Sequence, residues 1–302
     1  MKKYIILGLI FMISSCGKPE ESFTIKLDSN FEKYLVENKI DKDDAVNGRM
    51  NLQDARGVES LYIGGLGIKT LSGIENFNDL KLLYCSSNDL SELNLGNNPN
   101  LKDFDCGNNN LKILDLTSNS KLERIICWNN KLNSLQVGEN QYLTNLVCSN
   151  NQLQSIDVSK CPKLFSLSCY QNQLKSLNIE NNKVLQNLNC SDNELQVLNV
   201  FNNVYLENLS FFSNKISLID ISQNYKLDIL SGANNKLSNL DTRKQFDIKY
   251  LDCSGNQIKI ICVGDIEKAT VNSKIPRWNG SINGITSYYW KIDSGTTFSY
   301  CK

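Results

Sequence analysis

Cysteine is the residue type whose number and spacing first raise the question of chemistry. The chain of 302 residues contains 11 Cys. Zinc sites need converging thiolates, often at C-x-x-C spacing, whereas side chains that point the same way in register make poor disulfides. We therefore interpret the periodic cysteines as free thiols packed in a core, and we expect no metal and no cofactor. These cysteines share one position of a 21-residue period: Cys85, Cys106, Cys127, Cys148, Cys169, Cys190 and Cys253, with Phe211 and Gly232 in the two gaps.

The residues needed for most acid–base catalysis are missing. The sequence contains no His, which removes the usual Ser/His/Asp and Cys/His arrangements. Asp103 and Asp105 are the remaining candidate acid pair, but we expect both to be solvated, because Asn and Asp recur here as turn residues. The prediction is a protein that is not an enzyme.

Charge and composition exclude another class. The chain has 32 basic and 32 acidic residues, so it offers no bulk attraction to nucleic acid. Hydrophobic residues make up 41% and charged residues 21%, which is enough apolar material for a packed core. We expect a globular or repetitive protein that does not bind nucleic acid.

The amino terminus has the features of an export signal. Lys2 and Lys3 precede an apolar run over residues 4–12 that is too short to span a bilayer. The run ends at Ile13-Ser14-Ser15-Cys16, which resembles a bacterial lipobox. This predicts a lipoprotein signal peptide over residues 1–15, a lipid on Cys16 and a polar tether over residues 16–22. The alternative is an ordinary signal peptide with an incidental Cys.

The implied location is a bacterial envelope. Loss of residues 1–15 would leave the mature chain slightly acidic, so attachment to the membrane would depend on the lipid. Lys18 followed by acidic residues resembles the surface-export signal of Bacteroidetes lipoproteins. We expect a chain anchored by its lipid in the outer membrane and exposed at the cell surface.

A repeat of 21 residues fills most of the chain. Leu or Ile follows the periodic Asn by two residues, and an apolar residue, mostly Leu, precedes it by five, giving L-x-x-L-x-C-x-x-N-x-L-x-x-L-x-L. This is the leucine-rich repeat pattern. It predicts a solenoid of about ten coils over residues 61–263, with a parallel sheet on the concave face and short extended or turn segments on the convex face. The Asn column is Asn88, Asn109, Asn130, Asn151, Asn172, Asn193, Asn214, Asn235 and Asn256.

A second Asn column marks the opposite turn of each coil. In the first column we expect each amide to donate to the carbonyl of one coil and to accept from the next. Cys161 interrupts the second column, and we expect it on an outer turn, where it would be left as a free thiol. The second column is Asn98, Asn119, Asn140, Asn182, Asn203 and Asn224.

Residues 23–60 are predicted to form an amino-terminal cap. Asp28 or Ser29 would cap a short helix that turns Phe31, Tyr34 and Leu35 toward the first coil. The acidic stretch over residues 41–44 hints at a calcium loop, but Ala45 and Val46 occupy positions that such a loop needs for a ligand and for Gly. Calcium binding at this cap is therefore left open.

Residues 264–302 are predicted to form the carboxy-terminal cap. Cys262 and Cys301 bracket a segment rich in aromatic residues. In an oxidising compartment we expect them to form a structural disulfide. The aromatic residues of the segment are Trp278, Tyr288, Tyr289 and Trp290.

The residue that follows each ladder position should face outward on the concave side. That column contains Trp128, Tyr170 and Phe212 on alternate coils, mostly with Ser between them. The alternation predicts a notch over each small residue and rings on which a partner could pack. The alternative is that the rings pack on neighbouring strands. Charged residues expected nearby are Arg124, Lys131, Lys215 and Lys236, against Asp89, Asp103 and Asp105.

The cysteine column and the repeat resemble the internalin family, in particular internalins whose 21-residue repeats carry a cysteine ladder. The chain is also similar to leucine-rich repeat lipoproteins of flavobacteria, through Asn30 to Leu35 and the Cys262–Cys301 segment. The resemblance implies a cell-surface protein that recognises a protein ligand by its concave face, with Trp128, Tyr170, Phe212, Arg124 and Lys131 as candidate contacts. The lipobox, without a wall-sorting motif, favours a bacterium with two membranes. Glycan binding through the aromatic column is the alternative function.

Overall fold

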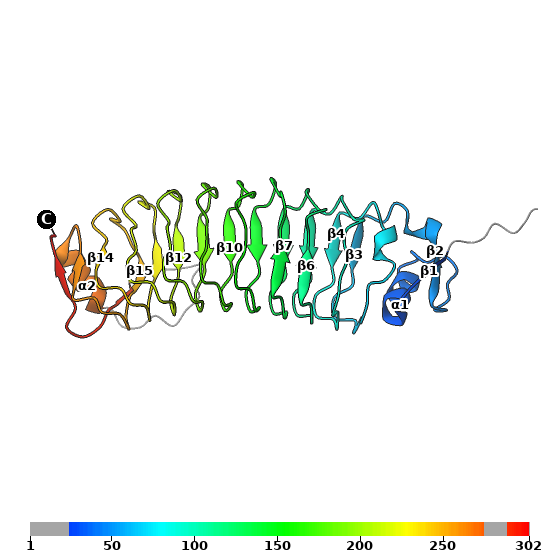
Figure 1. Cartoon of the computed structure of the whole chain (residues 1–302), viewed down its shortest axis with the longest axis horizontal. Coiled ribbons are helices and arrows are strands. Elements are labelled where there is room, and N and C mark those ends of the chain that lie inside the picture. The colour runs from blue at the N-terminus through cyan, green and yellow to red at the C-terminus, as the bar shows by residue number, and fades with distance from the viewer. Residues whose placement is uncertain (1–23, 275–288, 302) are drawn as a thin grey trace, which may run out of the picture.

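The chain folds into a long solenoid with a cap at each end (Figure 1). The structure is a computed structural model that describes residues 24–274 and 289–301. Its main sheet has 11 strands in the order β17-β15-β13-β12-β11-β10-β9-β7-β5-β4-β3. The predicted leucine-rich repeat solenoid is confirmed. In chain order the strands are β3 (Ser60–Tyr62), β4 (Leu82–Tyr84), β5 (Asp103–Asp105), β7 (Arg124–Ile126), β9 (Asn145–Val147), β10 (Ser166–Ser168), β11 (Asn187–Asn189), β12 (Asn208–Ser210), β13 (Ile229–Ser231), β15 (Tyr250–Asp252) and β17 (Tyr289–Lys291).

All pairs in this sheet are parallel, and the coil length sets their register. Leu83 lies opposite Phe104, and Phe104 lies opposite Ile125. Because one coil of 21 residues separates each pair, equivalent residues stack in straight files along the solenoid. The convex side carries shorter pairings: β6 (Ile113–Asp115) with β8 (Ser134–Gln136), and β14 (Leu240–Asp241) with β16 (Ile260–Cys262) and β18 (Thr297–Ser299).

The cysteine ladder is part of the hydrophobic core. Its seven thiols are free and at most 3% exposed. Burial raises the pKa of the Cys127 and Cys169 thiols to about 12, so they stay protonated and poor as metal ligands at neutral pH. Among residues 24–274 and 289–301, there is no group of three or more acidic, thiol or imidazole side chains that could hold a metal ion. The ladder thus packs as small apolar side chains do.

The first Asn column joins each coil to its neighbours. The Asn193 Nδ2 donates to Cys169 O at 3.0 Å, in the preceding coil, and to Cys190 O at 3.1 Å, in its own. Its Oδ1 accepts from Leu174 N at 2.9 Å. Cys190 O also accepts from the next amide, Asn214, at 3.1 Å. Asn193, Cys190 and Asn214 thus link three successive coils through buried hydrogen bonds, and the same bonds at Asn130, Asn151 and Asn172 are partly buried.

The second Asn column is also buried, and Cys161 interrupts it. Cys161 lies in this turn and its thiol is free, as expected, but the thiol is 0% exposed, because the column points into the core. Asn182 donates to Val158 O and Cys161 O at 3.0 and 2.8 Å. Since Cys161 has no amide to offer Val137 O, Asn140 turns and donates to that carbonyl instead.

The amino-terminal cap closes the first coil. It consists of β1 (Thr24–Lys26) paired with β2 (Arg49–Asn51), α1 (Ser29–Glu37) and the 3-10 helix η1 (Leu52–Ala55). Asp28 is the N-cap of α1 and accepts from the Asn30 and Phe31 N–H groups. The Phe31 ring lies 5.9 Å from the ring of Phe77, just after the 3-10 helix η2 (Ile74–Asn76), so α1 covers the apolar end of the solenoid.

The acidic residues of this cap bind backbone groups. The Glu32 carboxylate accepts from the N–H groups of residues 47–49 at 2.8–2.9 Å. Asp43 Oδ1 accepts from Ala45 N at 2.9 Å, and its Oδ2 from the Asn47 side chain at 2.7 Å. These hydrogen bonds account for the acidic stretch as turn chemistry.

The carboxy-terminal cap combines β17, β18 and α2 (Ile266–Lys274). Trp290, in β17, is buried, and its Nε1 donates to Ile248 O at 3.1 Å. The structure joins Cys262 and Cys301 in a disulfide with Cα atoms 5.3 Å apart, as predicted. Trp278 and Tyr288 lie outside the described residues, as do Cys16 and the rest of residues 1–23. In the described part of the chain, no helix is both long and apolar enough to cross a membrane.

Candidate functional site on the concave face

Three files of side chains face outward on the concave sheet. The first and third residues of most strands are partly exposed, while the middle residue is buried, as in β4, β5 and β7. The third file consists of the residues that follow the ladder cysteines. A partner that entered the concave face would therefore meet mainly these files.

Four residues on neighbouring coils form a connected group at the amino-terminal end of this face. Arg124 Nε donates to Asp103 Oδ1 at 2.8 Å, and Tyr84 Oη donates to Asp103 Oδ2 at 2.7 Å. Arg124 Nη2 also donates to Tyr84 Oη at 3.2 Å, and the guanidinium lies 5.5 Å from the Tyr84 ring centre. The Tyr62 ring packs edge-on against Tyr84 at 5.2 Å. We call Tyr62, Tyr84, Asp103 and Arg124 the Arg124 cluster.

The hydrogen bonds of the Arg124 cluster fix its orientation. Asp103 uses both carboxylate oxygens, and its bond to Tyr84 raises the pKa of that phenol, which keeps it a neutral donor. The Arg124 side chain stays 35% exposed, and Tyr62 is 54% exposed. The arrangement presents an aromatic edge and a held guanidinium, which are typical contact groups of protein interfaces.

The proposed acid pair is not arranged as the sequence suggested. Asp103 is only 24% exposed and belongs to the Arg124 cluster. Asp105 is also partly buried, and its Oδ1 accepts from Gly107 N at 2.9 Å. The expectation that both are solvated is therefore wrong, because the flanking aromatic and arginine side chains cover them. Both carboxylates have structural partners.

Asp105 gives the sheet a measurable pH response. Burial raises the pKa of its carboxyl group, so the ionised form is less favourable in the folded chain than in the unfolded chain. The penalty exists at neutral pH and disappears as the pH falls through the folded-state pKa. We expect Asp105→Asn to increase the free energy of unfolding by about 0.5 kcal/mol at pH 7.5 and by less near pH 4, as measured by urea denaturation. Asp103→Asn, which breaks an ion pair, should instead lower it; stabilisation by both variants would contradict this account.

The aromatic column is less open than predicted. Trp128, Tyr170 and Phe212 are partly buried, and the intervening Ser149 and Ser191 are 0% exposed. A Cβ placed on Gly107 would lie 2.6 Å from Trp128 Nε1, so that indole rests on the neighbouring coil. The predicted notches are wrong, because coils about 4.8 Å apart are closer together than an aromatic ring is long, and the rings lean over small neighbours.

The lysines named with this column lie elsewhere. Asp89, Lys131, Lys215 and Lys236 follow the Asn turn, and Lys131 N donates to Leu111 O at 2.9 Å. The Lys131 side chain is exposed there, and Lys215 pairs with Glu194 at 2.9 Å. Of the charged candidates, Arg124 and Asp103 come together, while Lys131 does not join them.

The tyrosines of the strands were not among the contact residues predicted from the sequence. Tyr62 and Tyr84 stand in the third strand position, and Tyr250 stacks on Tyr289 at 5.4 Å in the first position near the other end. Between the two tyrosine pairs the face is polar and uncharged on β10, β11 and β12, with Ser166, Ser168, Asn187, Asn189, Asn208 and Ser210. The same alternation, applied to the strand residues themselves, would have located both pairs.

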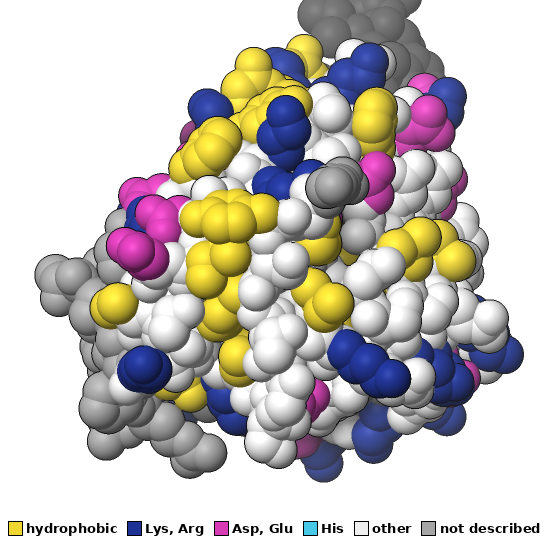
Figure 2. All heavy atoms as spheres, turned by 90° about the vertical axis from the view of Figure 1, so that its left-hand side faces the viewer, with side chains coloured by type: hydrophobic (Ala, Val, Ile, Leu, Met, Phe, Trp, Pro, Cys, Tyr) yellow, Lys and Arg dark blue, Asp and Glu magenta, His cyan; other side chains and the backbone are white. Residues whose placement is uncertain are grey.

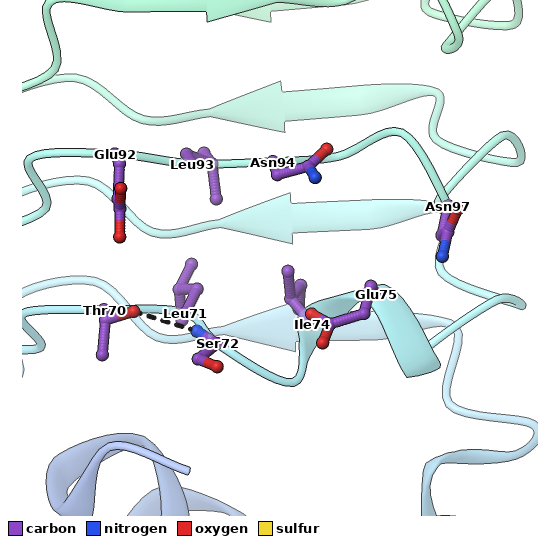
Figure 3. Close-up of a pocket in the computed structure, with 9 residues that line it drawn as sticks. All are labelled: Thr70, Leu71, Ser72, Ile74, Glu75, Glu92, Leu93, Asn94 and Asn97. Atoms are coloured by element: carbon purple, nitrogen blue, oxygen red, sulfur yellow. Dashed lines mark hydrogen bonds between the residues drawn. The ribbon is translucent and has the colours of Figure 1, made fainter. Parts of the chain in front are cut away.

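The convex side has a hollow of about 410 Å³ between the first two coils (Figure 3). Leu71 and Ile74 come from one coil, and Glu92, Leu93 and Asn94 come from the next. Glu75 Oε2 is already an acceptor, from Gly73 N at 2.9 Å. Ile74 and Glu75 belong to η2, and the lining of the hollow contains no converging nucleophile and base.

Comparisons with known proteins agree with this architecture. No protein-family model and no curated protein matches the chain. Among solved structures, the functional domain of InlJ from Listeria monocytogenes, which includes a cysteine ladder, matches with 30% identity and a TM-score of 0.72 over 80% of this chain. This chain covers 56% of that InlJ chain.

Two further matches show the fold alone. The internalin InlF from Listeria monocytogenes has 17% identity and a TM-score of 0.60, with 78% of this chain and 82% of InlF covered. The ectodomain of the plant receptor kinase GASSHO1/SCHENGEN3 from Arabidopsis thaliana has 22% identity and a TM-score of 0.64, with 84% and 32% covered.

The stacked coils and concave parallel sheet define a leucine-rich repeat protein. Within that class, the buried cysteine ladder makes the chain similar to the functional domain of InlJ, as the sequence resemblance implied.

Proposed function

We propose that this chain is a non-catalytic envelope lipoprotein that recognises a protein partner through its concave face, with the Arg124 cluster at the centre of the contact. The observation that carries the proposal is the hydrogen-bonded Tyr84–Asp103–Arg124 group with the exposed Tyr62 beside it. Tyr and Arg on a rigid sheet lose little conformational entropy on binding, which makes them effective contact residues.

Other leucine-rich repeat structures support the type of partner. The plant receptor ectodomain was solved in complex with CASPARIAN STRIP INTEGRITY FACTOR 2, and the LRIM1/APL1C structure is a complex of two proteins. In this chain, Trp128 would border the contact next to Arg124, and Tyr170 and Phe212 would extend it along the third file. Lys131 would lie outside it. The glycan alternative has little support, because the three rings that would serve as stacking platforms are partly buried and the Trp128 indole rests on the neighbouring coil.

Site-specific cross-linking tests the contact. A photoreactive residue placed at Tyr62 should cross-link to a protein from host or neighbouring-cell extracts, and Arg124→Ala should reduce the yield about tenfold or more. Lys131→Ala is the matched control and should change the yield less than twofold. The same photoreactive residue at Ile113, on the convex strand β6, should give background yield. Equal yields at the two positions would contradict the proposal.

The lipid anchor is tested separately. We propose that residues 1–15 are removed, that Cys16 carries the lipid, and that the chain is held in the outer membrane with the solenoid outside the cell. Radiolabelled palmitate should enter the wild type and not Cys16→Ser, while Cys161→Ser, which changes a buried thiol, should label normally. Protease added to intact cells should remove the solenoid. Equal labelling of wild type and Cys16→Ser would refute lipidation at that residue.

A further inference from the structure

One edge of the solenoid carries exposed apolar side chains that the repeat does not need. They lie on the turns of the second Asn column in the carboxy-terminal half and on the turn that follows, where Gln245 takes the Asn position, and they are 38% to 74% exposed. We call them the turn strip: Val184, Phe201, Val204, Tyr205, Tyr225 and Phe246. Figure 2 looks onto the carboxy-terminal end and shows hydrophobic side chains beside Lys and Arg side chains there.

The earlier coils show that the fold accepts polar residues at these positions. The corresponding turn is Gly-Asn-Asn-Pro-Asn over residues 96–100 and Thr-Ser-Asn-Ser-Lys over residues 117–121. Both turns keep the same buried Asn and the same hydrogen bonds: Asn98 donates to Ile74 O, and Asn119 to Leu95 O. Phe201, Tyr225 and Phe246 are therefore not required for the turn, and their exposure needs another explanation.

Basic residues accompany the turn strip. Lys226 Nζ lies 4.8 Å from the centre of the Tyr205 ring, and Lys163 Nζ lies 5.1 Å from that of Tyr142, one coil apart in each case. The six turns over residues 138–142, 159–163, 180–184, 201–205, 222–226 and 243–247 contain six basic and three acidic residues, whereas the whole chain has 32 of each. Two of the basic residues have acidic partners: Arg243 pairs with Asp241, and Lys160 Nζ lies 3.9 Å from Glu139 Oε1. The edge is thus locally positive on a neutral protein.

Aromatic rings interleaved with lysines are typical of surfaces that lie in the headgroup region of a bilayer. There the rings enter the boundary with the acyl chains while the ammonium groups stay among the phosphates. A straight file of coils presents these groups along one line, which suits a flat partner better than a concave one. We propose that the turn strip rests on an anionic lipid surface, so that the solenoid lies along the membrane on this edge.

Vesicle binding tests this proposal without the lipid anchor. A chain that begins at residue 16 and carries Cys16→Ser would be mixed with vesicles of phosphatidylglycerol and phosphatidylcholine, or of phosphatidylcholine alone, and sedimented. We expect binding to the anionic vesicles that falls as salt is added. Tyr225→Ser combined with Phe246→Ser should weaken it about tenfold. Lys163→Glu, Lys183→Glu and Lys226→Glu together should remove the preference for anionic vesicles.

Matched variants on another face control for general effects. Ile113 and Leu218 are 59% and 62% exposed on the convex side, so Ile113→Ser with Leu218→Ser removes similar apolar area away from the turn strip. Lys112→Glu, Lys175→Glu and Lys259→Glu together reverse the same number of charges at exposed positions away from the turn strip. Both controls should bind vesicles as the parent does, and all variants should melt within a few degrees of it. The proposal is overturned if the parent does not bind anionic vesicles, or if the turn-strip variants and the control variants bind these vesicles equally well. Because these proteins lack a lipid, the result is independent of the proposals for Cys16 and the concave face.

Discussion

Asn193→Leu should lower the free energy of unfolding by about 3 kcal/mol, although Leu matches Asn in size and the site is buried. The ladder carbonyls would keep a donor: Cys169 O would still accept from Asn172, and Cys190 O from Asn214. The Leu174 N–H, however, would lose its acceptor, Asn193 Oδ1, inside the core. Urea denaturation followed by circular dichroism would measure the change.

Asn193→Asp tests the acceptor and the donor of this side chain separately. It keeps an acceptor for Leu174 N but places a second oxygen against three carbonyls, those of Cys169, Cys190 and Ser191. At neutral pH it should be less stable than Asn193→Leu, and acid should restore part of the loss, because a protonated carboxyl donates one hydrogen bond. Asn181→Leu, at an exposed turn position, should cost less than about 1 kcal/mol. A loss as large at Asn181 as at Asn193 would show that the ladder has no special role.

Gly232→Cys should destabilise the protein by about 3 kcal/mol, although it restores the residue type that the repeat has at this position. A Cβ on Gly232 would lie 2.5 Å from Cζ of Phe211, the ladder residue of the preceding coil. The Phe211 ring, which is 1% exposed, occupies the space that two cysteines would otherwise share. Thermal and urea unfolding under reducing conditions would measure the loss.

The double variant tests that explanation. Phe211→Cys alone should leave a cavity and cost about 2–3 kcal/mol, whereas Phe211→Cys with Gly232→Cys should recover to within about 1 kcal/mol of the wild type. The pair would then continue the ladder between Cys190 and Cys253. Additive losses in the double variant would mean that the two positions do not compensate each other.

The fold was predictable because the repeat fixes it many times over. Asn, Leu and Cys recur at fixed offsets, so a misinterpreted residue in one coil does not change the interpretation of the others. The parallel sheet, the buried thiols and the Asn hydrogen bonds then follow from the stacking of the coils. The Cys262–Cys301 disulfide could also be predicted, because these two cysteines lie outside the ladder and bracket the cap. The burial of Cys161 was not predicted, because a single interruption in a column does not show whether the column faces inward.

The site was harder to predict, because it depends on contacts between coils rather than on the period. The alternation showed that Trp128 faces outward, but not that its indole lies over Gly107. Asp103 appeared as part of an acid pair because its sequence neighbour is Asp105, whereas its partners are Tyr84 and Arg124, on the coils to either side. The register of the sheet places equivalent residues side by side on neighbouring strands. Contacts between residues 19 to 21 apart in the sequence can therefore be found by comparing neighbouring strands position by position.

The Asn bonds between coils have a consequence for how such a molecule can change in length. The Asn193 amide bonds only to its own coil and to the preceding coil, so it does not tie one end of the rod to the other. A whole coil could therefore be duplicated or deleted between existing ones, with the new boundaries making the contacts that the old ones made. The span of the concave face is thus adjustable in steps of 21 codons, while the two ends stay unchanged.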